Sequence, residues 1–85
     1  MRIDFSSSFL KAYKKLSIEV LNQFESKQKI FLSNPFHSSL RTHKLSGKMS
    51  GYYAFSISYQ YRVIFRYIDT DFVLFLDIGT HDIYD

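Results

Sequence analysis

Basic, histidine and tyrosine side chains in three separate segments of this 85-residue chain could together act on a phosphodiester. The candidates are His43, Lys44, Lys48, Arg62, Arg66, His81 and Tyr84. A histidine titrates near neutral pH and can give or take a proton. An arginine keeps its charge, and its planar fork matches phosphate oxygens. Such a set suits cleavage of RNA by its own 2′-hydroxyl, which needs a base, an acid and cations around the pentavalent phosphorane.

The acidic residues do not suggest a rival metal site. Asp69 and Asp71 fall in a turn signal, while Asp82 and Asp85 lie at the end of the sequence, without the spacing of metal ligands. The chain contains no cysteine, which excludes a disulfide framework and a thiolate metal site. We therefore predict a metal-independent reaction with no cofactor.

The positive charges are concentrated in the first part of the chain. Residues 1–48 hold nine Lys or Arg against three acids, whereas residues 49–85 hold two Arg against five acids. The segment 41–48 favours a polyanion such as nucleic acid. The remaining lysines are interpreted as solvated helix faces: Lys11, Lys14, Lys15, Lys27 and Lys29.

Strands must position these side chains. Strict alternation of apolar and small residues over 53–59 predicts a half-buried strand. In the next strand, Arg62 and Arg66 are spaced to project from the same face of a sheet. The almost continuous apolar run after Asp69-Thr70-Asp71 predicts a strand buried on both faces.

Helices are expected between the first strand and these later ones. Ser6 to Ser8 and Ser17 are candidate helix N-caps, and Asn34-Pro35 ends the helical stretch. Residues 7–33 are therefore interpreted as two antiparallel helices, with one kinked helix as the alternative. The predicted strands are 2–5, 52–59, 61–68 and 72–79.

The resulting fold class is α+β in a single domain over residues 1–85. Its order β-α-α-β-β-β predicts a mainly antiparallel four-stranded sheet with an αα-hairpin on one face. Nine Phe and seven Tyr allow a small core to bury much area. Neither a signal peptide nor an apolar run of membrane-spanning length is present, so a cytoplasmic protein without membrane association is expected.

Several segments in combination carry a resemblance to a known family: FLKAYKKL, NPF, HKLSGKMSGYYAFSI, YRVIFRY and IGTHDIY. The chain resembles toxins of the RelE/ParE superfamily from bacterial type II toxin–antitoxin systems, in particular the RelE/YafQ-like mRNA interferases. The resemblance implies a RelE-like toxin domain that cuts mRNA in the ribosomal A site. It also implies a tightly bound cognate antitoxin as partner, in a toxin–antitoxin hetero-oligomer.

Matched position by position, the resemblance implies catalytic roles for His43, Arg62, His81 and Tyr84. Arg62 corresponds to the phosphate-supporting arginine, His81 to the histidine of the G-T-H ending, and Tyr84 to the terminal aromatic. Substrate binding is expected of Lys44, Lys48 and Arg66. The general base stays open among His43, Lys44 and His81.

Other interpretations stand beside these roles. YafQ-like toxins have a second histidine and an aspartate where this chain has Ser56 and Gln60. A ParE-like inhibitor of DNA gyrase, or a degenerate module that only binds an antitoxin, are the alternative functions. At the level of single residues, Arg62 could pair with Asp77 or Asp82 across strands, Tyr84 could be a core aromatic, and His81 an ordinary surface histidine.

Overall fold

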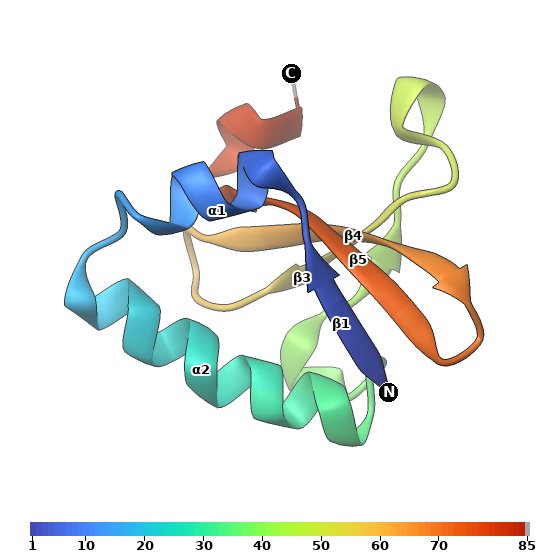
Figure 1. Cartoon of the computed structure of the whole chain (residues 1–85), viewed down its shortest axis with the longest axis horizontal. Coiled ribbons are helices and arrows are strands. Elements are labelled where there is room, and N and C mark those ends of the chain that lie inside the picture. Colours follow the sequence, from blue (N-terminus) through green and yellow to red (C-terminus); the bar gives the residue numbers. More distant parts are fainter. Residues whose placement is uncertain (85) are drawn as a thin grey trace.

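The computed structural model of the protein describes residues 1–84, in which one sheet carries two helices on one face (Figure 1). The helices and strands are β1 (Arg2–Phe5), α1 (Ser7–Tyr13), α2 (Ile18–Ser33), β2 (His43–Lys44), β3 (Tyr53–Ser56), β4 (Arg62–Asp69) and β5 (Phe72–Gly79). Three short 3₁₀ helices connect or follow them: η1 (Ser38–Leu40), η2 (Gly47–Met49) and η3 (His81–Tyr84).

The α+β class is confirmed, but the predicted four-stranded sheet is wrong in two respects. The sheet has five strands in the order β1-β5-β4-β3-β2. The additional strand, β2, contains only two residues, which is too short for any periodicity to reveal. The sheet is also mixed, because β1 pairs with β5 in parallel while the other pairs are antiparallel.

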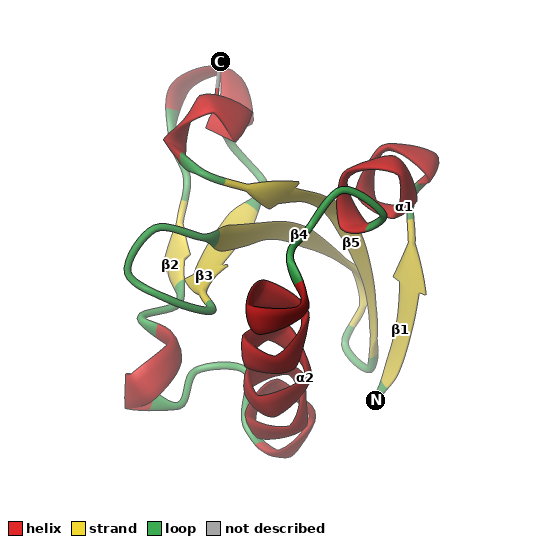
Figure 2. Ribbon diagram, turned by 90° about the vertical axis from the view of Figure 1, so that its left-hand side faces the viewer, coloured by secondary structure: helices red, strands yellow, loops and turns green. Residues whose placement is uncertain are grey.

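Two helices form as predicted, each with the expected serine cap. The Ser6 hydroxyl accepts a hydrogen bond from the Phe9 N–H at 3.0 Å, and the Ser17 hydroxyl accepts one from the Val20 N–H at 3.3 Å. Figures 1 and 2 show that α1 and α2 are splayed, so the two helices differ in detail from the predicted αα-hairpin. The reason is that α1 packs on β5 and touches α2 through the rings of Phe9 and Tyr13, which both lie against Phe24.

The core between helices and sheet is built from aromatic rings. Phe31 of α2 stacks on Phe55 at 4.9 Å between ring centroids, and meets Phe65 and Phe75 edge-on at 5.0 and 5.3 Å. All four side chains are fully buried. These favourable ring geometries anchor α2 across the three central strands. They thereby fix α2 relative to β3 and β4.

Strand β5 alternates between buried and half-exposed residues, so the prediction that it is buried on both faces is wrong. The antiparallel pairing of β5 with β4 contains a bulge. Asp77 lies opposite Ile64 and Phe75 lies opposite Phe65, which leaves Leu76 as the extra residue. The bulge brings Gly79 into register with Arg62. None of the helices within residues 1–84 has both the length and the apolar character needed to cross a bilayer.

Candidate active site

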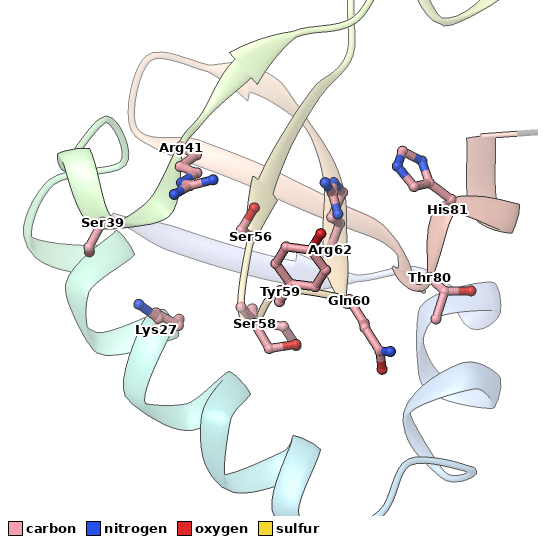
Figure 3. Close-up of a pocket in the computed structure, with 11 residues that line it drawn as sticks. Lys27, Ser39, Arg41, Ser56, Ser58, Tyr59, Gln60, Arg62, Thr80 and His81 are labelled. Atoms are coloured by element: carbon pink, nitrogen blue, oxygen red, sulfur yellow. The ribbon is translucent and has the colours of Figure 1, made fainter.

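A cavity of about 660 Å³ opens where β3 ends and β4 begins (Figure 3). Its lining comes from α2, from η1 and the residue after it, from β3, the β3–β4 turn and β4, and from the segment that leads from β5 into η3: Lys27, Ser39, Arg41, Ser56, Ile57, Ser58, Tyr59, Gln60, Arg62, Thr80 and His81. Three of these residues are permanent cations and none is acidic. We call this cavity the basic cleft; its charge suits an anionic ligand.

Arg62, the first residue of β4, lies at the centre of the basic cleft. It is in register with Ser56 on β3 and with Gly79 on β5, so its guanidinium rises between two small side-chain positions. The alternative in which Arg62 pairs with Asp77 or Asp82 is not observed, because the ion pairs found within residues 1–84 involve neither of these carboxylates. Within the described part of the chain, no ion pair therefore occupies the Arg62 guanidinium.

Gly79 allows η3 to fold back over the end of β5. A Cβ built on Gly79 would lie 2.6 Å from Cγ2 of Ile83, a distance at which one of the two groups has to move. The missing side chain thus makes room for η3, which carries His81 and Tyr84. Their ring centroids are 5.5 Å apart. His81 lines the basic cleft and is exposed, whereas Tyr84 is partly buried behind it.

The Tyr84 hydroxyl is closed off from solvent and has no hydrogen-bond partner among residues 1–84. Burial raises the pKa of Tyr84 above its ordinary value, and the nearby charge of Arg62 offsets part of that rise in pKa. Tyr84 is therefore a neutral phenol next to the cation of Arg62. A buried polar group without a partner is rare in folded proteins and calls for an explanation.

The other residues expected in the site do not line the basic cleft. His43 is opposite Ala54, and Ala54 is opposite Ile64, so His43 shares a face with Arg62 but lies on the edge strand. Lys44 is opposite Tyr53, which places it on the other face of the sheet.

Arg66 shares the face of Arg62, as the alternation predicts, but is in register with Leu74, further along β4 and β5. Lys48 lies in η2 within the β2–β3 loop and is exposed. The structure thus brings Arg62, His81 and Tyr84 together, and leaves the remaining candidates on nearby edges and loops.

Two cations that line the basic cleft were not predicted as site residues. Lys27 projects from α2, where its spacing resembles that of any solvated helical lysine. Arg41 follows η1 with a left-handed backbone, φ 52°. The charge cluster at 41–48 pointed to this loop, but not to Arg41 itself. Among the described side chains, no three of His, Asp or Glu gather as metal ligands would.

Comparisons with known proteins point to one fold. The crystal structure of YafQ from Escherichia coli superposes with a TM-score of 0.80, covering 99% of this chain and 98% of that one at 19% identity. A YoeB/ParE toxin from Agrobacterium tumefaciens gives 0.79 over 95% and 99% at 16% identity. A YoeB–YefM complex from Staphylococcus aureus gives 0.77 over 95% and 97% at 19% identity. The chain has the fold of these toxins.

This likeness confirms the RelE-like fold expected from the sequence. Models of protein families give no match to the sequence, and neither do curated protein sequences. At identities below a quarter the likeness describes architecture, so activity has to be argued from the site.

Proposed function

We propose that this chain is the toxin of a type II toxin–antitoxin pair and acts as a metal-independent endoribonuclease on ribosome-associated mRNA. The observation that carries the proposal is the grouping of Arg62, His81 and Tyr84 at the basic cleft of a fold shared with YafQ and YoeB. A fixed cation, a proton-transfer group and a phenol meet there, beside a cavity that no acidic side chain of residues 1–84 lines.

The chemistry is an in-line attack within the RNA. The 2′-oxygen bonds to phosphorus as it loses its proton, and the bond to the 5′-oxygen breaks as that oxygen gains one. Arg62 stabilises the extra negative charge on the phosphorane, and His81 moves one of the two protons. The products are a 2′,3′-cyclic phosphate and a free 5′-hydroxyl.

The second proton requires another group. His43 and Lys44 remain candidates for the general base, since catalytic geometry often tightens only when substrate is bound. His43 is better placed, because it shares the sheet face of Arg62. Its Nδ1 donates to the carbonyl of Arg41 at 3.0 Å, which leaves Nε2 as the proton acceptor.

A cognate antitoxin in a hetero-oligomer is part of the same proposal. YafQ and YoeB have been solved as DinJ–YafQ and YoeB–YefM complexes. This chain carries a net charge of +3 and exposes Ile18, Phe36 and Leu10. An acidic, amphipathic segment would match both features. The proposed location of the pair is the cytoplasm, where mRNA is translated.

The test is single-turnover cleavage of mRNA on purified translating ribosomes. Arg62→Ala and His81→Ala should each slow cleavage about a hundredfold, the scale of one lost electrostatic or proton-transfer contribution. The matched control is Arg2→Ala, since Arg2 lies on β1 and pairs with Asp4. The proposal is refuted if Arg62→Ala and His81→Ala cleave as fast as the control Arg2→Ala, or if the wild-type protein leaves RNA intact.

A second function, antitoxin binding without catalysis, is favoured by one observation. Ser56 and Gln60 line the basic cleft at the positions where YafQ-like toxins have a histidine and an aspartate. Among the described residues that line this cavity, His81 is the only histidine. A folded wild-type protein that binds its antitoxin tightly but cuts no RNA would support this function.

A further inference from the structure

A second pair of cations faces Arg62 and His81 across the basic cleft. Arg41 extends into the cavity from the position after η1, and Lys27 extends into it from α2, both on the side away from η3 (Figure 3). Neither takes part in the ion pairs found among residues 1–84. The charge of this wall is therefore not neutralised within the described chain.

Arg41 keeps its position at a cost to the backbone. With φ at 52° it is left-handed, a conformation that costs an ordinary residue about 1–2 kcal/mol and that glycine adopts freely. Hydrogen bonds hold it from both sides: its N–H donates to the Ser38 carbonyl at 3.3 Å, and its carbonyl accepts from His43 Nδ1 at 3.0 Å. Strain of this kind, maintained by its surroundings, clusters at functional sites.

An unpacked aromatic ring completes this part of the basic cleft. Tyr59, in the turn between β3 and β4, is 95% exposed although it lines the cavity. A ring that contributes nothing to the core offers a flat face to a ligand. Nucleobases stack on such rings with little sequence preference.

We propose that Arg41, Lys27 and Tyr59 form a second RNA subsite, distinct from the cleavage centre at Arg62 and His81. Arg41 and Lys27 hold the phosphate that neighbours the scissile one, and Tyr59 stacks on the adjoining base. The inference rests on the proposed ribonuclease function. Contacts to this neighbouring nucleotide are made equally before and during the reaction, so they should affect substrate binding and not the chemical step.

The test uses binding of a fluorescent, single-stranded 2′-O-methyl oligonucleotide, which cannot be cleaved. Arg41→Gly should weaken binding and reduce the salt slope of log Kd by about 0.7, the value for one lost phosphate contact on a single strand. Since glycine relieves the backbone strain, this variant should unfold at no lower urea concentration than wild type. Tyr59→Ala should weaken binding roughly tenfold without changing the salt slope.

The matched control is Lys15→Gln, which removes the same charge from the exposed turn between α1 and α2. It should bind as wild type does. In single-turnover cleavage, Arg41→Gly should raise the protein concentration that gives half of the maximal rate and leave the maximal rate unchanged. Arg62→Ala should lower the maximal rate.

Two outcomes overturn the inference, and they distinguish failure of the subsite alone from failure of the proposed function. If Arg41→Gly and Lys15→Gln change Kd and salt slope equally, the wall of Arg41 contributes only general charge and the subsite is refuted, while cleavage by wild type still stands. If wild type neither binds the oligonucleotide at low salt nor cuts RNA, both the subsite and the ribonuclease function are refuted.

Discussion

Replacing Tyr84 by phenylalanine should make the protein more stable. The Tyr84 hydroxyl has neither solvent nor a hydrogen-bond partner within the described residues 1–84, so folding removes its bonds to water and no described group replaces them. A buried, unsatisfied polar group costs about 1–3 kcal/mol. Part of that gain is offset because the neutral phenol lies beside the Arg62 charge. We expect Tyr84→Phe to raise the free energy of unfolding by about 1 kcal/mol, which corresponds to a melting temperature roughly 4–8 °C higher for a domain of this size.

The pH dependence follows from the same burial. The pKa of Tyr84 is raised in the folded protein, so the folded state binds its proton more tightly than the unfolded chain does. The stability linked to that proton is fully present below the unfolded pKa of about 10 and is lost as pH rises through the folded pKa. The stability advantage of Tyr84→Phe over wild type should therefore be larger at pH 10.5 than at pH 7.

Urea unfolding at the two pH values measures both effects. Tyr59→Phe is the matched control, because the side chain of Tyr59 is 95% exposed and its hydroxyl stays hydrated in either state. A Tyr84→Phe protein that is less stable than wild type by 1 kcal/mol or more would refute the reasoning, since it would mean that the hydroxyl has a partner. Slower RNA cleavage by the stabilised variant would show that the unpaired hydroxyl serves the substrate.

Three further predictions concern the basic cleft. Gly79→Ala should reduce the cleavage rate tenfold or more, because the new Cβ displaces Ile83 and with it η3. The Gly79→Ala, Ile83→Ala double variant lacks the clashing methyl group and should recover part of the rate. Unchanged cleavage by the single variant would contradict this role of the glycine. Ser56→His should speed cleavage, since it adds a second proton-transfer group beside Arg62; a rate no higher than wild type would mean that the base is already present. EDTA should change the rate on isolated RNA by less than about twofold, and a large loss would point to a metal-dependent step.

Much of the local structure could be predicted from short-range patterns. The serine caps of α1 and α2 and the ends of β1 and β5 agree with the prediction, because caps, alternation and apolar runs all depend on neighbouring residues. Arg62 and Arg66 share a face for the same reason. The turn at 69–71 forms with the Asp71 N–H donating to the Asp69 carboxylate at 2.9 Å, as this residue type favours.

Contacts between distant segments were beyond the reach of these patterns. The parallel pairing of β1 with β5 joins strands about seventy residues apart, and no local period encodes strand direction. The bulge at Leu76 and the two-residue β2 arise from register, which depends on the partner strand.

The same distinction between short-range patterns and long-range contacts applies to the candidate site. The sequence by itself determined which residue types could do the chemistry, because histidine, arginine and tyrosine have their proton and phosphate affinities wherever they lie. Only the tertiary structure decided which of them meet: η3 folds over Gly79 and brings His81 and Tyr84 to Arg62. The same packing brings Arg41 and Lys27 to that cavity from segments that looked like ordinary surface, since proximity in space depends on how helices and strands pack and not on spacing along the chain.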